Sequence, residues 1–354
     1  MKTDASSRIA TTADPRDAAR EPDGPSGYRA AREGAALFDR PESTLVEITG
    51  SERLPYLNSL CTNKMIDLEP GRSARAFLLV PTKGRVLADF IACESGAATW
   101  LECQGGSGPT VIELLGKYYF GQDVAFHDRS DAWRVLAVVG PDAGRILTGI
   151  LPDVPPAEEG THEETALGGV TARALKWSDA GPPGCHLWVS AGAADTARQA
   201  ILEAGATHGT EDAWTLLQIE SGVAAFGREL GEDVIPLEAP TGNAIDHDKG
   251  CYPGQEVITR LHFRGRPARH LRGLRIEGEM PFPTGVTLDA ADKPAVAVVT
   301  ASAVSPALGP IALAYVHRDY CDAGSRLTLD APSGGGARVD ATVADLPLFP
   351  PASE

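Results

Sequence analysis

The stretch Asp248-Lys249-Gly250-Cys251-Tyr252-Pro253-Gly254-Gln255-Glu256 is the most informative part of this chain. Two glycines surround a cysteine, and a proline follows at a position that suits the first turn of a helix. We therefore expect a tight turn that leads into a helix over about residues 253–261. A thiol beside Lys249 and close to a helix N-terminus is predicted to be partly ionised and reactive. The alternative is a small buried cysteine, the usual state of an isolated intracellular thiol, but the polar neighbours of Cys251 favour a site.

Upstream of this stretch, residues 211–221 have the pattern of a well-bounded helix. Thr210 is a natural N-cap, and Gly222 stands just past the end. Glu220 falls on the apolar face in the last turn, where desolvation and the helix dipole both disfavour a carboxylate. Glu220 therefore needs a partner, either an arginine in an internal ion pair or the donor groups of a ligand.

Asp89 is the second carboxylate of interest. In a predicted strand over residues 85–92 it alternates onto the same side as Leu87 and Ile91. It is therefore expected to point toward a core or a cavity. The alternative is an aspartate at the edge of a hairpin that bonds to the backbone.

The chain divides into three predicted parts. Residues 1–27 are polar and lack periodicity, which predicts a disordered tail. Residues 28–265 are predicted to form an α+β region of two ferredoxin-like lobes, with exchange of strands between the lobes left open. Residues 266–354 contain short β-type runs broken by Gly and Pro, which predicts a small β-barrel or sandwich. The two lobes are expected to contain strands 44–49, 74–80, 85–92, 98–103, 123–127, 133–139, 168–177 and 185–190, helices 52–61, 109–119, 142–150, 192–204 and 211–221, and a loop over 152–164.

Composition narrows the classes of function. The net charge of −16 repels nucleic acid phosphates, so general binding to DNA or RNA is disfavoured. No stretch approaches the roughly 18 apolar residues of a membrane span, and no signal peptide is evident, so we expect a cytoplasmic protein without membrane contact. The six scattered cysteines include no CxxC pair, which is typical of a reducing compartment. Neither the cysteines nor Asp246-His247-Asp248 have the spacing of metal ligands, so no metal site is expected.

Arginines gather after the predicted helix that follows Cys251. Such a cluster can hold an anionic ligand tail or a phosphate-bearing partner, or it can connect the core to the C-terminal domain. Arg260, the member nearest to Cys251, is the one that we assign to function. The cluster consists of Arg260, Arg264, Arg266, Arg269, Arg272 and Arg275, with His262 and His270 among them.

The string KGCYPGQE resembles the KGCYxGQE signature of the YgfZ family, folate-binding relatives of the glycine-cleavage aminomethyltransferase. The stretch from Gln218 to Glu238 is similar to the RxExG…GxEL…PxE pattern of aminomethyltransferases. Near the start, residues 37–40 and 57–63, followed by Pro70-Gly71, resemble the N-terminal folate-fold pattern LFDR, FLNxLxTN and LxPG. The resemblance covers about residues 28–350. One departure is Gln218, where the transferases usually carry arginine.

This resemblance implies an aminomethyltransferase-like folate-binding fold, with tetrahydrofolate or a one-carbon derivative as cofactor. It implies that Glu220 hydrogen-bonds the pterin and that Asp89 acts on a folate nitrogen, while Cys251 is a reactive thiol at the folate site or a transient ligand for iron–sulfur cargo. Cys251 and Asp89 are thus the expected catalytic residues. The expected cofactor-binding residues are Glu220, Lys249, Gly250, Tyr252, Gln255, Glu256, Arg260 and Asn63.

The function implied by the resemblance is folate binding in the assembly or repair of iron–sulfur proteins, including enzymes that modify tRNA. Reduced folate and iron–sulfur client or assembly proteins are the expected partners. One alternative is a folate-dependent aminomethyltransferase or demethylase, for which Asp89 supplies the acid or base. The other alternative is a non-catalytic scaffold that binds protein partners.

Overall fold

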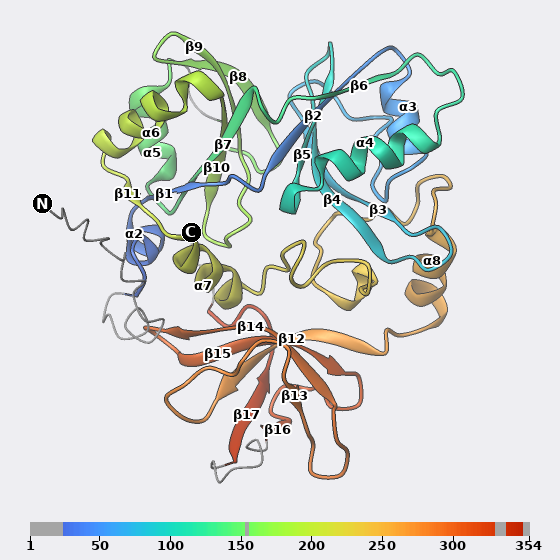
Figure 1. Cartoon of the computed structure of the whole chain (residues 1–354), viewed down its shortest axis with the longest axis vertical. Coiled ribbons are helices and arrows are strands. Elements are labelled where there is room, and N and C mark those ends of the chain that lie inside the picture. Colours follow the sequence, from blue (N-terminus) through green and yellow to red (C-terminus); the bar gives the residue numbers. More distant parts are fainter. Residues whose placement is uncertain (1–23, 153–155, 330–337, 350–354) are drawn as a thin grey trace, which may run out of the picture.

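The structure is a computed structural model that describes residues 24–152, 156–329 and 338–349. Its chain forms two α/β lobes side by side and a C-terminal β-domain beneath them (Figure 1). The predicted disordered tail, residues 1–27, lies outside the described residues except for its last four. No helix among the described residues is long and apolar enough to cross a membrane.

The first lobe is a five-stranded antiparallel sheet in the order β3-β4-β5-β2-β6. Helix α4 contacts strands β2, β5 and β6, and apolar side chains of the sheet and the helices form one core. The elements are β2 (Thr44–Thr49), α3 (Arg53–Asn58), β3 (Ser73–Leu79), β4 (Val86–Glu94), β5 (Thr99–Cys103), η1 (Gln104–Gly106), α4 (Gly108–Lys117) and β6 (Ala125–Asp128).

The second lobe takes one strand from the start of the chain. Its six-stranded sheet has the order β11-β1-β7-β10-β9-β8, in which β1 (Ala36–Asp39) pairs antiparallel with β7 and parallel with β11. The N-terminal strand β1 therefore belongs to the sheet of the second lobe, whose other strands follow the whole first lobe in the sequence. The other elements are α2 (Tyr28–Glu33), β7 (Trp133–Val139), α5 (Ala143–Ile150), β8 (His162–Leu167), β9 (Val170–Leu175), β10 (Gly184–Ser190), η2 (Ala191–Ala193), α6 (Ala194–Glu203) and β11 (Thr207–His208).

The C-terminal domain is a six-stranded antiparallel sheet in the order β13-β14-β15-β12-β17-β16. A bridge between Asp289 and Thr328 joins its two ends, so the sheet is a nearly closed barrel. The predicted fold class, an α+β aminomethyltransferase-like fold with a C-terminal β-barrel, is confirmed. The strands are β12 (Arg269–Ile276), β13 (Thr287–Leu288), β14 (Ala297–Ser305), β15 (Gly309–His317), β16 (Arg326–Leu329) and β17 (Val339–Ala344).

The bounds of several predicted elements differ from the structure. Strand β8 begins at His162, inside the predicted loop 152–164, and the predicted strand 168–177 is shorter, as β9. Strand β8 lies at the sheet edge, where Glu163 and Glu164 are exposed, so its sequence lacks the apolar alternation that marks a buried strand.

Helix α8 (Gln255–Arg264) begins two residues after the predicted start at 253. Helix α7 (Glu211–Ser221) has the predicted bounds, with the Thr210 hydroxyl accepting from the amide of Ala213.

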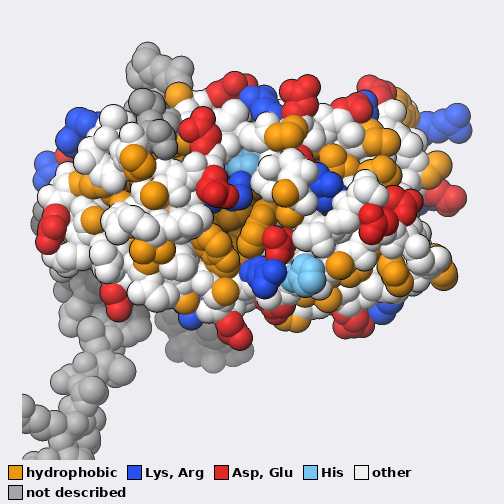
Figure 2. Space-filling view, turned by 90° about the horizontal axis from the view of Figure 1, so that it is seen from above, with side chains coloured by type: hydrophobic (Ala, Val, Ile, Leu, Met, Phe, Trp, Pro, Cys, Tyr) orange, Lys and Arg blue, Asp and Glu red, His pale blue; other side chains and the backbone are white. Residues whose placement is uncertain are grey.

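The two lobes meet at a cluster of tryptophans. The ring centroids of Trp100 and Trp133 lie 5.7 Å apart in an edge-on arrangement, and Trp188 lies 6.4 Å from Trp100. Trp188 is buried in an apolar cluster with side chains from both sheets. The space-filling view from above shows a hollow between the lobes with hydrophobic side chains in its floor (Figure 2).

His162 forms a second contact between the lobes. Its Nε2–H donates to the carbonyl of Glu94 in β4 (2.9 Å), and its Nδ1 accepts from Arg173 Nη1 (3.0 Å). Burial, with Arg173 adding to its effect, lowers the pKa of His162 to about 4 from the ordinary 6.5. Protonation of Nδ1 would place its N–H against an N–H of Arg173, so the native contact needs the neutral ring.

The contact predicts loss of stability in acid. Because the folded pKa of His162 lies below the unfolded value, the contact is fully stable above about pH 6.5 and weakens as the pH falls toward 4. We expect the unfolding free energy to drop by about 2 kcal/mol more between pH 7.5 and 4.5 in the wild type than in His162→Gln. Urea unfolding measures this difference. His127→Gln, at an exposed histidine of β6, is the control and should follow the wild type; identical pH curves for all three proteins would contradict the assignment.

Candidate functional site

Lys249 has an internal partner for every donor of its ammonium group. Nζ donates to the carbonyls of Asn58, Cys61 and Asn63, each at 2.7 Å. Because an ammonium group has three N–H donors, none remains for a ligand. Burial lowers the pKa of Lys249. Lys249 therefore ties the loop before α8 to the end of α3, and the structure gives no support to its predicted contact with a cofactor.

Gly254 fixes the loop of residues 248–254, here called the Cys251 loop, on the hairpin between β3 and β4. Its φ is 86°, and a Cβ atom there would lie 3.0 Å from Cβ of Leu79 and 3.1 Å from the carbonyl of Val80. Only glycine combines this conformation with so close an approach. Tyr252 is buried beside it, with the ammonium of Lys249 5.2 Å from its ring centroid, and burial raises the pKa of Tyr252 to about 12.

Cys251 is exposed, whereas the other five cysteines are buried. The ammonium of Lys249 donates to carbonyls of residues 58–63 and not to the thiol. Helix α8 begins four residues after Cys251. The reactivity of the thiol therefore stays a prediction. What the structure provides is an accessible thiol on a loop that Lys249 and Gly254 hold in place.

Of the other residues predicted near the cofactor, Gln255, Glu256 and Arg260 lie together on α8. Gly250, Glu256 and Arg260 are exposed, and Gln255 is partly exposed. Asn63 is committed to the backbone, since its amide donates to the carbonyls of Arg75 (2.8 Å) and Asn243 (2.7 Å). The exposed face of α8 borders an open groove lined by Gln255, Glu256, Thr259, Arg260, Phe263 and Arg264.

A polar cavity of about 260 Å³ lies between the lobes and the loop after α7; we call it the central cavity. Strand β4, the short helix η1, helix α7 and the segment after β9 supply its walls. Its charged side chains come from both lobes. The lining consists of Arg40, Glu42, Arg75, Asp89, Gln104, Gly105, Asp179, Glu211, Gln218 and residues 223–228.

Asp89 lines the central cavity, as the alternation in its strand predicted. Its carboxylate accepts two hydrogen bonds from Arg75, Nε to Oδ1 at 2.9 Å and Nη2 to Oδ2 at 2.5 Å. Burial raises the pKa of Asp89 although this guanidinium opposes the rise. The hairpin register contains a signal for the pair that sequence reasoning missed, since Phe77 faces Asp89 and Arg75 lies two residues away on the same face.

Gln218 holds an arginine at the wall of the central cavity. Its amide nitrogen donates to the carbonyl of Asp179 (3.0 Å), and its oxygen accepts from Nη2 of Arg228 (3.1 Å). Arg228 also donates through Nε to Glu229 at 2.9 Å. Arg228, from the loop after α7, thus places a positive charge beside Gln218.

Glu220 does not line the central cavity. Its side chain is fully buried and forms an ion pair with Arg32, while the hydroxyls of Tyr28 (2.8 Å) and Ser305 (2.6 Å) donate to Oε1. Burial, with the Glu220 carboxylate adding to its effect, raises the pKa of Tyr28 to about 12. The internal ion pair that the sequence left open is therefore formed. Contact of Glu220 with a pterin stays a prediction, and the observed partners disfavour it.

Comparisons with known proteins agree with this architecture. Residues 24–249 match the GCVT N-terminal domain, and residues 269–350 match the glycine cleavage T-protein C-terminal barrel domain. The chain therefore belongs to the glycine cleavage T-protein family, whose members use folate.

Two curated relatives illustrate the similarity. The chain is 32% identical to the aminomethyltransferase of Mycolicibacterium paratuberculosis over 305 residues, 83% of this chain and 80% of that protein. It is 25% identical to a putative chloroplastic transferase of Arabidopsis thaliana over 304 residues, 85% of this chain and 70% of that protein. Among solved structures, the glycine cleavage system aminomethyltransferase T from Bartonella henselae has the same fold, with a TM-score of 0.80, 20% identity, and 91% and 88% of the two chains covered.

Removal of the buried Glu220 carboxylate should destabilise the protein. Glu220→Ala leaves the guanidinium of Arg32 without its partner, which typically costs about 3–5 kcal/mol. Chemical unfolding measures the loss. The control is Glu33→Ala, which breaks an exposed ion pair with Arg29 and should change stability by less than about 1 kcal/mol. Equal unfolding free energies of the two variants would show that the ion pair of Glu220 with Arg32 does not stabilise the fold.

Proposed function

We propose that this protein binds tetrahydrofolate or a one-carbon derivative in the central cavity and acts, as a YgfZ-type member of its family, in the assembly or repair of iron–sulfur proteins in the cytoplasm. The observation that carries the proposal is the exposure of Cys251 on a loop fixed by Lys249 and Gly254. A single accessible thiol on a rigid loop suits a reaction with an external partner. One thiol does not hold a cluster, so the remaining ligands must come from that partner.

The face beside Cys251 supports contact with a partner. Within the described part of the chain, the side chains of Arg260, Arg264 and Arg266 form no hydrogen bond or ion pair, although the protein is strongly acidic. Phe263, on the same helix, is 64% exposed. Exposed arginine and aromatic side chains are typical of protein–protein interfaces.

The central cavity has groups that suit a pterin. The edge of the amino-pyrimidinone ring has adjacent donors and acceptors, which carboxylates and amides match. The cavity offers the carboxylate of Asp179, the amide of Gln218 and the guanidinium of Arg228. Asp89 becomes available to a ligand only if its bonds to Arg75 open.

Calorimetric titration with tetrahydrofolate, and then with folinic acid, tests the cofactor. We expect micromolar binding. Absence of binding would contradict the proposed cofactor and would favour the scaffold that binds only protein partners.

Substitution of Cys251 tests the role of the thiol. Cys251→Ser should keep the unfolding free energy and the folate affinity within about 0.5 kcal/mol, because the side chain is exposed. It should lose the ability to restore iron–sulfur enzyme activity in cells that lack the protein. Thr196→Ala, an exposed change on α6 in the second lobe, is the control and should restore activity. Full restoration by Cys251→Ser would rule out a thiol mechanism.

A folate-dependent aminomethyltransferase is the second candidate, favoured by the place of Asp89 in the cavity wall. If the protein transfers a one-carbon unit from an amine to tetrahydrofolate, Asp89→Asn should lower the rate about 100-fold or more, because the variant lacks the proton-transferring group. Single-turnover assays with a methylamine donor measure the rate. No turnover by the wild type would exclude this candidate.

A further inference from the structure

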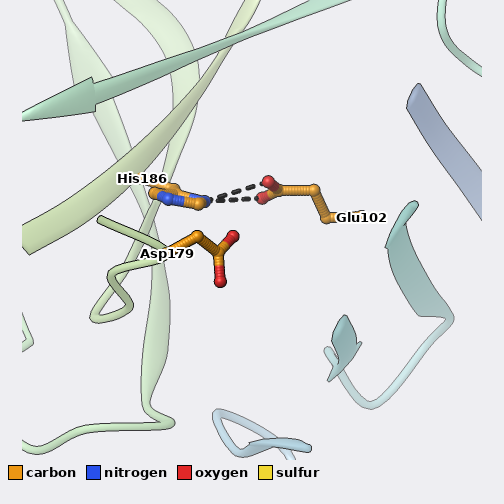
Figure 3. A group of neighbouring side chains, drawn as sticks. All are labelled: Glu102, Asp179 and His186. Carbon is orange, nitrogen blue, oxygen red and sulfur yellow. Dashed lines mark hydrogen bonds and ion pairs between the residues drawn. The ribbon is translucent and has the colours of Figure 1, made fainter. Parts of the chain in front are cut away.

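Three potential metal ligands from three separate segments meet behind the wall of the central cavity. Glu102 comes from β5 of the first lobe, His186 from β10 of the second, and Asp179 from the segment between β9 and β10. One ligand atom from each lies within 4.8 Å of the other two. Figure 3 shows the carboxylates of Glu102 and Asp179 on the same side of the His186 ring.

Glu102 is held firmly in this position. The side chain is fully buried, and its oxygens face Nδ1 of His186 at 2.9 and 3.1 Å. Trp188 Nε1 donates to Oε2 at 2.7 Å, and the Ser43 hydroxyl donates to Oε1 at 3.3 Å. Such outer hydrogen bonds are the usual means of orienting a carboxylate that binds a metal.

Asp179 connects the group to the central cavity. It is partly exposed and lines the cavity, and Trp177 Nε1 donates to its Oδ1 at 2.7 Å. Within the described ranges, no Lys or Arg forms an ion pair with this carboxylate; the guanidinium of Arg75 is near enough to interact electrostatically but is bonded to Asp89. Asp179 can thus turn toward a cation that enters from the cavity once its hydrogen bond from Trp177 opens.

The charge of the group also favours a cation. Two carboxylates share one imidazole, so the group stays negative even when His186 is protonated. A divalent ion with a neutral imidazole would balance both carboxylates and would replace the proton between His186 and Glu102. Buried charge that is paired in this way avoids much of the desolvation cost.

We propose that Glu102, Asp179 and His186 bind a divalent transition-metal ion such as Zn²⁺, with Nδ1 of His186 and one oxygen of each carboxylate as ligands. Around a tetrahedral ion with bonds of about 2.1 Å, ligand atoms lie about 3.4 Å apart. The observed spacing needs only a small closing movement, chiefly of Asp179. Three protein ligands leave one coordination position for water or another ligand. The proposal does not depend on Cys251 or on folate.

Equilibrium dialysis of metal-free protein against Zn²⁺, with the bound metal measured by mass spectrometry, tests this site. We expect one equivalent in the wild type, and a visible absorption spectrum of four-coordinate Co²⁺ when Co²⁺ replaces it. Asp179→Asn should weaken binding about 100-fold or more. This variant is expected to fold, because Asp179 is partly exposed and has one side-chain hydrogen bond. His186→Gln should abolish binding, but its side chain is buried, so its fold must be verified first.

The surface near α8 provides the control. His247 and His262 stack there with ring centroids 3.7 Å apart, and Cys251 is exposed on the preceding loop, so Zn²⁺ can bind there adventitiously. The double variant Cys251→Ser, His262→Gln should keep the full equivalent and the Co²⁺ spectrum. Loss of the metal in this double variant, its retention in Asp179→Asn, or no binding by the wild type would each overturn the proposal.

Discussion

The buried carboxylate of Glu220 is the contact on which the arrangement of the domains depends. It receives donors from Arg32 and Tyr28 of α2 and from Ser305 at the end of β14, while its backbone carbonyl accepts from the amide of Phe349 (2.9 Å). One side chain at the end of α7 thus joins the N-terminal helix to the C-terminal barrel. A buried charge with three donors holds them in one geometry, because any other arrangement leaves that charge unpaired.

The Cys251 loop depends on a similar constraint. The ammonium of Lys249 binds three carbonyls around the end of α3, and Gly254 packs against the hairpin of β3 and β4. The same hairpin carries Asp89 into the central cavity. The hairpin of β3 and β4 therefore connects the Cys251 loop to the central cavity, although the two remain separate sites. This separation is why we assign the folate and the thiol to different surfaces.

The central cavity is a place where nearly every charge is already paired. Arg75 holds Asp89, Arg228 holds Glu229, and Arg40 lies in ion pairs with Glu42 and Glu211. Pairs of this kind keep a polar cavity stable without a ligand, and a ligand must replace at least one of them. Asp179 is the exception among the lining carboxylates that the structure describes, and it stands next to the buried pair of Glu102 and His186. The uncompensated charge thus lies at the junction of the two lobes.

The sequence by itself determined most of the elements, the fold class and the family resemblance, because these follow from local signals: Thr210 and Gly222 bound α7, the period of two marks most strands, and the KGCYPGQE string is contiguous. It also placed Asp89 on a cavity face, since alternation along a strand is a local property. Only the tertiary structure decided which groups pair with the buried charged side chains. Glu220 pairs with Arg32, 188 positions away in the sequence. Lys249 binds carbonyls more than 180 positions away, and Glu102 pairs with His186, 84 positions away. Such pairings depend on how the sheets and domains pack, and a buried charge takes whichever partner that packing brings within hydrogen-bond distance.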